Sequence, residues 1–382
     1  MEFNSNGCFI ALMAFMSHFI SGCIAKGIGV LLPTLRDQLV THTWIIGIVG
    51  ALMGVASDVA GLSTLPLENL FGYRRVTISC SIVGSFGMIL LPSVTNPVHI
   101  ALALAVLVGP SLGIFTVLGK ALVGRHFSKQ YALACGVAYA GQALSLLAVA
   151  PMTQVFLDTY GWRGAMLLIA GICIHMVPSA IAVKVIKAEY DPISYTKITN
   201  TDQEYQERSE GAVTLCIKAF SRIIRKNLDL TILLEFNFWI VATCRFSVSC
   251  VFTTWLLYFV PHLQVKGFSP QVAASICSAG AVGSLIGSII WSPFVDRGLI
   301  TSTSGMVLSS LALTLSFVLD PWVTDFISCL AVTLAFGVFA SSVYTLVDVM
   351  TKEILGKERL VSAFGWMRAF FLPRLIAGFV PG

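Results

Sequence analysis

The sequence predicts an all-α polytopic membrane protein with about eleven membrane-spanning helices. Hydrophobic residues fill 56% of the 382 positions and charged residues only 11%, whereas soluble domains carry about 25% charged residues. The mean hydropathy is +0.86. Apolar runs recur along the whole chain, and many reach the roughly 20 residues that a helix needs to cross a bilayer.

These apolar runs can be placed in order along the chain. The predicted spans are residues 8–33, 44–67, 76–95, 98–121, 131–155, 163–185, 230–261, 271–294, 303–320, 322–350 and 361–381. The first run is not a cleaved signal peptide, because it lacks a basic start, is too long, and contains Lys26.

One polar segment divides the spans. Residues 186–229 are mixed in charge and follow six spans. We therefore expect a six-helix bundle over residues 1–185, a cytoplasmic linker over 186–229 and a second bundle over 230–382. Inside the linker, the stretch VTLCIKAFSRIIRKN has apolar residues at roughly helical spacing. It is either an amphipathic helix on the membrane surface or part of a solvated linker.

The second set of spans is shorter than the first by about one helix and its loop. The sequence also ends on an apolar stretch, IAGFVPG. We therefore expect that a twelfth span is missing, so that the sequence is either a fragment or an isoform without it.

The positive charges indicate an orientation. If the N-terminus is cytoplasmic, the loops on that side hold most of the 24 lysines and arginines, Lys120 among them, whereas the outer loops hold Arg36, Arg163 and Lys266. This asymmetry follows the positive-inside rule and predicts that the N-terminus and the linker are cytoplasmic. A net charge of +5 that is spread over membrane loops also argues against nucleic acid as a partner.

Cysteine usage and motif content bear on enzymatic functions. Ten cysteines are scattered without paired short spacing, which is typical of small packing residues rather than of disulfides or a zinc site. No P-loop or HExxH motif occurs. We expect neither an enzyme nor a bound cofactor or metal.

Four stretches carry a family resemblance. They are LFGYRRV (70–76), GRHFSKQYALACGVAYAG (124–141), YGWRGA (160–165) and GKERLVSAFG (356–365). In order and spacing they resemble segments of the monocarboxylate transporters, solute carrier family 16, within the major facilitator superfamily. The resemblance implies a major facilitator fold whose two bundles alternate access to a midplane site. It also implies a plasma-membrane protein and allows a single-span, immunoglobulin-like escort protein as a partner.

Some motif residues have structural interpretations. Gly72 permits a tight turn between predicted helices 2 and 3, where Arg74 and Arg75 meet helix-end carbonyls or lipid headgroups. Trp162 and Arg163 suit an anchor at the outer interface.

Two glycines in the longest motif favour close helix packing. Gly136 and Gly141, with alanines between them, give predicted helix 5 a face of small residues. Such a face lets a neighbouring helix approach closely. Rocking bundles also need smooth interfaces of this kind.

Lys26 lies in the apolar stretch SGCIAKGIGV. A lysine at the centre of a spanning helix costs roughly 2.5–3.5 kcal/mol, so it should face a cavity or a partner. The family resemblance implies that Lys26 attracts the carboxylate of a substrate. The alternative is a lysine whose ammonium reaches the outer interface.

Several other polar side chains interrupt apolar runs. Arg245 and Arg368 are cations that either hold an organic anion or pair with an acid, and Asp58 is the clearest buried acid. Asp58 either pairs with one of these cations or titrates during transport. Four further side chains orient a substrate or simply pack between helices: Tyr139, Gln142, Ser341 and Ser342.

Predicted helix 8 departs from the family. It reads QVAASICSAGAVGSLIGSIIWSPFVDR and holds no charge before Asp296, with Gly283 and Gly287 near the places where the family's prototypes carry an Asp and an Arg. We therefore expect transport of a small organic solute, a monocarboxylate or related anion or zwitterion, by alternating access. The missing charges favour facilitated diffusion over a proton symporter. The alternative is a non-transporting membrane scaffold or regulator derived from a transporter.

Overall fold

The computed structural model describes residues 4–38, 43–94, 96–184 and 228–370. These ranges contain helices and turns and no β-strand. The helices are α1 (Ser5–Gln38), α2 (Thr43–Ala60), α3 (Thr64–Phe71), α4 (Tyr73–Leu90), α5 (Pro97–Leu102), α6 (Gly109–His126), α7 (Tyr131–Ile174), α8 (Met176–Ala182), α10 (Phe236–Val265), α11 (Pro270–Ile290), α12 (Ser292–Asp296), α13 (Ser302–Leu319), α14 (Phe326–Leu355) and α15 (Leu360–Ala369). Most of the predicted linker, with its amphipathic stretch, lies outside these residues.

The long helices confirm the predicted all-α membrane class. Nine helices among the described residues are long and apolar enough to cross a membrane. One of them, Tyr131–Ala182, contains two predicted spans, joined at Gly161, whose φ of 68° and ψ of 179° are not helical. The predicted span 361–381 begins as α15 and is described as far as residue 370.

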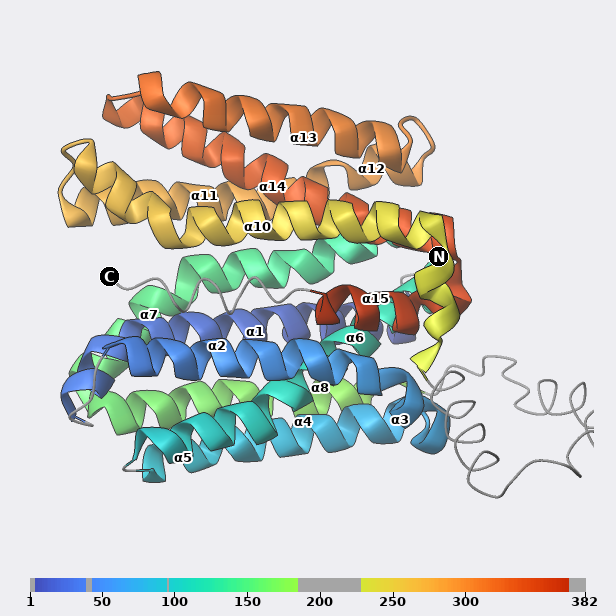
Figure 1. Ribbon diagram of the computed structural model, residues 1–382, viewed down its shortest axis with the longest axis horizontal. Coiled ribbons are helices and arrows are strands. Elements are labelled where there is room, and N and C mark those ends of the chain that lie inside the picture. The colour runs from blue at the N-terminus through green and yellow to red at the C-terminus, as the bar shows by residue number, and fades with distance from the viewer. Residues whose placement is uncertain (1–3, 39–42, 95, 185–227, 371–382) are drawn as a thin grey trace, which may run out of the picture.

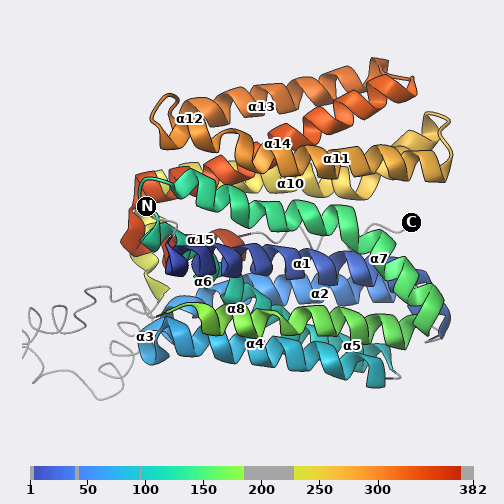
Figure 2. The ribbon, with the colours of Figure 1, turned by 180° about the vertical axis from the view of Figure 1, so that it is seen from behind.

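The helices lie roughly parallel in two groups (Figures 1 and 2). The first group is α1–α8 and the second is α10–α14. The first part of α7 lies against α11 of the second group, and α15 packs on α2 and α6. We call the end of the molecule at which Lys184 and Leu228 lie the linker end, and the opposite end the far end. Most helices run the full length between these ends.

One glycine and one proline shape helix ends. Gly72, with φ 77°, ends α3 and begins α4 without any longer loop, a conformation that costs a residue with a side chain more than it costs glycine. Pro261 was expected to end the seventh span, but α10 continues to Val265. A proline near a helix end removes one hydrogen bond, which membrane helices tolerate.

Glycines also set how closely the helices approach. A Cβ on Gly141 would lie 2.3 Å from the carbonyl oxygen of Phe15 on α1. A Cβ on Gly136 would lie 2.3 Å from the carbonyl oxygen of Ser288 on α11. The two glycines of α7 therefore face different partners, since Gly141 packs inside the first group and Gly136 packs against the second.

The glycines of α11 explain why predicted helix 8 carries no charge. A Cβ on Gly283 would lie 2.2 Å from the carbonyl oxygen of Leu334, and one on Gly287 would lie 1.9 Å from that of Val338. Both glycines press against the backbone of α14. This packing leaves no room for a charged side chain at either position.

Candidate functional site

A buried carboxylate lies between the two groups of helices. Asp348, on α14 of the second group, is 2% exposed. Its Oδ2 lies 2.8 Å from Nζ of Lys120 on α6 and accepts a 2.7 Å hydrogen bond from the hydroxyl of Tyr139 on α7. Its Oδ1 lies 3.5 Å from Nη1 of Arg245 on α10. We call Lys120, Tyr139, Arg245 and Asp348 the central cluster.

The hydroxyl of Tyr139 connects all three charges. It accepts hydrogen bonds from Lys120 Nζ at 2.6 Å and from Arg245 Nη1 at 2.7 Å while it donates to Asp348. A phenol offers one donor and two acceptor positions, so these three bonds use its full capacity. Tyr139 is therefore fixed in place by both groups of helices.

Aromatic rings surround the central cluster. The imidazole of His18 on α1 stacks on the ring of Tyr139, with centroids 4.7 Å apart. The guanidinium of Arg245 lies over the ring of Tyr344 on α14, 4.6 Å from its centroid. Cations over ring faces are stabilised by the ring quadrupole, most strongly where water is excluded.

The charges of the central cluster do not balance. Lys120 and Arg245 are both cations, and Asp348 is the acid that pairs with them among the described residues. The cluster thus holds one net positive charge in the interior of the protein. Burying an uncompensated charge is costly, so the arrangement favours the entry of one further anion.

Two of the four residues of the central cluster were predicted from the sequence. Tyr139 and Arg245 were both predicted site residues, and the structure brings them into contact. Lys120 was expected in a cytoplasmic loop, which is wrong, because α6 continues to His126 and its Lys120 side chain is 10% exposed. Asp348 was missed, although an acid in the apolar run TLVDVM is the same signal that identified Asp58.

Lys26 lies apart from the central cluster on α1. It is half-buried and follows His18 by two turns, about 12 Å along the helix toward the far end. No acid or hydrogen-bond acceptor pairs with Lys26 among the residues that the structure describes. Its ammonium lies near the thiol of Cys277 on α11, so it faces the second group of helices.

Asp58 pairs with Arg368, one of the two cations offered as its partner. Oδ1 of Asp58 on α2 lies 3.0 Å from Nη2 of Arg368 on α15. The same Nη2 donates to the Ser57 hydroxyl at 2.8 Å. This pair is a second charged contact between residues that precede the linker and residues that follow it.

Of the remaining polar candidates, some pack between helices and others lie near the central cluster. Ser342 donates to the carbonyls of Gly287 and Val338, so it serves the contact of α14 with α11. Ser341 is buried on the same face of α14 as Tyr344 and Asp348. Gln142 is half-buried where α7 meets α1.

The structural motif residues lie near the two ends. Arg74 and Arg75 are exposed in the first turn of α4 at the linker end. Arg163 stacks over the ring of Trp162 at 4.3 Å and donates to the carbonyl of Pro92 at 3.1 Å. Trp162 itself is buried.

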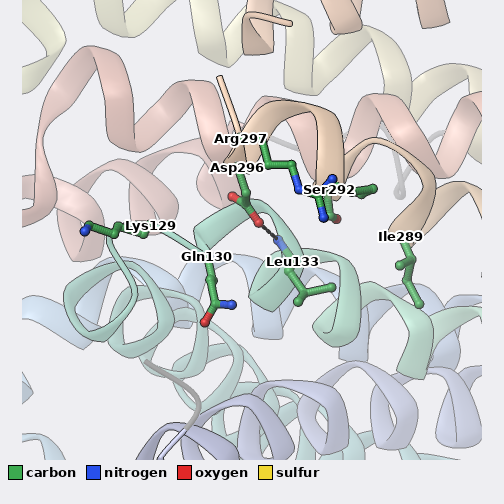
Figure 3. Close-up of a pocket in the computed structure, with 8 residues that line it drawn as sticks. Lys129, Gln130, Leu133, Ile289, Ser292, Asp296 and Arg297 are labelled. Carbon is green, nitrogen blue, oxygen red and sulfur yellow. Dashed lines mark hydrogen bonds between the residues drawn. The ribbon is translucent and has the colours of Figure 1, made fainter. Parts of the chain in front are cut away.

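A cavity of about 620 Å³ lies between the groups at the linker end (Figure 3). Beside it, the carboxylate of Asp296 accepts hydrogen bonds from the backbone N–H groups of Ala132 and Leu133, at 2.9 and 3.0 Å. An acid at the start of α7 is stabilised there by the free N–H groups of the helix. The cavity is lined by Lys129, Gln130, Leu133, Ile289, Ser292, Pro293, Asp296 and Arg297.

Further hydrogen bonds join the two groups near the linker end. The hydroxyl of Tyr131 donates to the carbonyl of Asp348 at 3.2 Å, and the ammonium of Lys352 donates to the carbonyl of Phe127. Together with the hydrogen bonds of Asp296, these contacts join the two groups of helices at the linker end. Within the described ranges, no group of three His, Cys, Asp or Glu side chains is placed to hold a metal ion.

The many spanning helices, with a buried charged cluster between two groups of them, define a polytopic membrane transporter. The chain belongs to the major facilitator superfamily, whose profile matches residues 11–377. A solved structure of the proton:xylose symporter XylE with bound 6-bromo-6-deoxy-D-glucose has a TM-score of 0.68 at 15% identity, over 96% of this chain and 87% of that one. This superfamily is a class of transporters, not of enzymes.

Curated relatives confirm the resemblance to monocarboxylate transporters. Monocarboxylate transporter 12 of Rattus norvegicus is 23% identical over 372 residues, which cover 94% of this chain and 74% of the relative. Monocarboxylate transporter 13 of Rattus norvegicus is 23% identical over 364 residues, covering 94% and 77%. Monocarboxylate transporter 11 of Homo sapiens is 30% identical over 176 residues, covering 45% and 36%.

Proposed function

We propose that this protein carries a small organic anion or zwitterion, in the simplest case a monocarboxylate, across the membrane by alternating access. The observation that carries the proposal is the net positive charge of the central cluster. Two buried cations share one carboxylate between the two groups of helices, and a carboxylate substrate would neutralise the site. The curated relatives are monocarboxylate transporters, which agrees with this chemistry.

In this proposal, Lys26 is the first residue that attracts the entering anion. It has no counter-ion among the described residues and faces α11 on the far side of the central cluster from the linker end. An anion that enters from the far end would meet Lys26 and then, about 12 Å further on, the cluster.

The contacts that join the two groups at the linker end support a state that is accessible from the far end. Asp296, Tyr131 and Lys352 all join the two groups near the linker end. We propose that the linker end is cytoplasmic, as the distribution of positive charge predicts, and that the protein resides in the plasma membrane.

Uptake of labelled solutes into cells that express the chain tests this function. The panel contains lactate, pyruvate, aromatic amino acids, creatine and carnitine, each at two external pH values. Lys26→Ala should lower uptake at low substrate concentration about tenfold or more, because it removes a charged contact worth roughly 1.5–3 kcal/mol. Lys357→Ala is the matched control, since the Lys357 side chain is 65% exposed.

Surface expression must be equal for the three proteins, with and without a co-expressed single-span escort. Equal rates at both pH values are expected, because α11 carries glycines where the proton-coupled prototypes carry charges. No uptake of any solute at full surface expression would contradict transport and favour the scaffold alternative. Equal uptake by wild type and Lys26→Ala would remove Lys26 from the substrate path.

A further inference from the structure

The central cluster already contains one carboxylate that belongs to the protein. Asp348 Oδ2 lies 2.8 Å from the ammonium of Lys120, the distance of a charge-assisted hydrogen bond. A carboxylate substrate that binds the same ammonium must compete with Asp348. The protein thus carries an internal ligand for its own anion site.

Asp348 does not satisfy the two cations equally. Its contact with Arg245 Nη1 is 3.5 Å, and that nitrogen donates instead to the hydroxyl of Tyr139 at 2.7 Å. A guanidinium carries several further N–H donors on a planar fork that suits a carboxylate. Among the described residues, Nε and Nη2 of Arg245 have no hydrogen-bond acceptor. This cation therefore has donors left for another carboxylate, its own Asp348 or a substrate.

The members of the cluster come from both groups of helices. Lys120 and Tyr139 lie on α6 and α7, whereas Arg245 and Asp348 lie on α10 and α14. The Lys120–Asp348 ion pair consequently joins the two groups of helices. Separating the groups without an anion would leave Lys120 as an unpaired buried charge, which is costly.

We propose that Asp348 is an internal counter-anion that the carboxylate of the substrate displaces from Lys120, and that this exchange releases the tie between the two groups of helices. In the loaded site, the substrate pairs with Lys120 and Asp348 pairs with Arg245 of its own group. Two cations then meet two anions, so the loaded cluster is neutral. This inference rests on the proposed function, since it assumes an anionic substrate.

Three variants separate the effect of the cluster's net charge from the effect of the Lys120–Asp348 ion pair. Asp348→Asn raises the net charge of the cluster from one positive charge to two, Lys120→Met lowers it to zero, and the double variant returns it to one. All three variants break the ion pair between the groups. Anion affinity should follow the net charge, whereas opening of the linker end should follow the loss of the ion pair.

Benzoate is the probe for anion affinity, because the site is walled by the rings of Tyr139, Tyr344 and His18. Benzamide has a similar shape and no charge, so it serves as the control. With the purified full chain in lipid nanodiscs, Asp348→Asn should bind benzoate about tenfold tighter than wild type and Lys120→Met about tenfold weaker. The double variant should return to within about threefold of wild type.

Cys135 reports on opening of the linker end. It lies on α7 between Tyr131 and Tyr139 and is 6% exposed. Cys173, on the same helix but packed inside the first group, is 1% exposed and is the matched control. Alkylation by N-ethylmaleimide, followed by peptide mass spectrometry, should be slow at Cys135 in wild type and faster with benzoate but not with benzamide. All three variants should react fast at Cys135 without any ligand, while Cys173 stays protected.

The outcomes distinguish this inference from the proposed function. If wild type binds benzoate or pyruvate but Asp348→Asn binds it no tighter, Asp348 does not compete with the substrate, although the cluster still binds anions. If Cys135 of Asp348→Asn stays as protected as in wild type, the ion pair does not hold the groups together. If wild type binds no carboxylate at all, the proposed function fails and the inference falls with it. Should Asp348→Asn fold poorly, the double variant must still bind benzoate more tightly than Lys120→Met.

Discussion

Two buried carboxylates, Asp348 and Asp58, join the same two parts of the chain in different ways. Asp58 pairs with Arg368, which also donates to the Ser57 hydroxyl, so one anion meets one cation in this ion pair. Asp348 faces two cations and leaves one positive charge over. Charge balance therefore separates a contact that only joins helices from one that can also bind an anionic ligand.

The cations that pair with the two carboxylates also differ in how far they are exposed. The Arg368 side chain is 22% exposed, whereas the Lys120 side chain is 10% exposed. An exposed cation that loses its partner can turn toward water or headgroups. A buried one cannot, so removal of its partner costs more.

The largest predicted effect is the loss of stability on removal of Asp348. Asp348→Ala leaves two buried cations without a counter-ion and should lower the free energy of unfolding by about 3–5 kcal/mol. Asp58→Ala removes one charged contact from a partly exposed arginine and should cost about 1.5–3 kcal/mol. Denaturation by SDS of the purified protein in lipid bicelles compares the two variants.

Ala at both positions removes the same atoms, so the side-chain volume lost is matched. If the two variants lost equal stability, the excess charge in the central cluster would be balanced by another group. The central cluster would then have no excess positive charge to attract an anion.

Two uncharged contacts of α7 differ in the same way, since one lies within the first group and the other lies between the groups. Gly136 and Gly141 lie on α7, and a Cβ on either would come within 2.3 Å of a carbonyl oxygen, that of Ser288 or that of Phe15. Gly141→Ala pushes α7 from α1 inside the first group and should destabilise the fold by about 1–3 kcal/mol. Gly136→Ala acts on the contact with α11 between the groups, so it should hold the linker end open at a smaller cost in stability.

The two alanine variants are each other's controls, because the helix, the substitution and the clash distance are the same. Thermal denaturation measures stability. Opening is measured by alkylation of a thiol introduced by Ser292→Cys, since Ser292 is 1% exposed beside the linker-end cavity. Faster alkylation is expected with Gly136→Ala alone. Equal melting temperatures and equal alkylation in both variants would show that the two interfaces are mechanically alike.

Much of the fold could be predicted from the sequence because it follows from local properties. Apolar runs of the length of a bilayer mark the spans, and the order of the family motifs indicates the superfamily. Gly72 is a local signal too, since its backbone conformation is one that glycine adopts at low cost. Helix ends were less predictable, because α10 passes Pro261 and α6 continues to His126, past the predicted end at residue 121.

The candidate site could be predicted only in part because its contacts span the chain. Tyr139 and Asp348 are 209 positions apart, and no local pattern indicates which acid meets which cation. Lys120 precedes the basic motif GRHF and therefore resembled a loop lysine. Ser342 was predicted either to orient a substrate or to pack between helices. Its hydroxyl bonds to backbone carbonyls of α11 and α14, a contact that depends on packing between segments far apart in the sequence.

The smallest predicted effect concerns Asp325, a carboxylate that ties neither group to the other. At the far end it caps α14, where its Oδ2 accepts a 3.0 Å hydrogen bond from the backbone N–H of Ser328. This hydrogen bond lowers the pKa of the Asp325 carboxyl below its ordinary value. The cap therefore stabilises the folded state above the ordinary pKa of about 4, and the stabilisation is lost as the pH falls through the lower, folded-state value.

Asp325→Ala should accordingly give a small decrease in melting temperature at pH 7 and a smaller one in strong acid, with benzoate affinity and Cys135 alkylation unchanged. Asp325→Asn is the matched control, because its side-chain oxygen keeps a cap while the charge is lost. A change in benzoate affinity with either variant would mean that anions sense charge at the far end in general. In that case Asp348 would differ from the other carboxylates only in its distance from the bound anion, and not through its contact with Lys120.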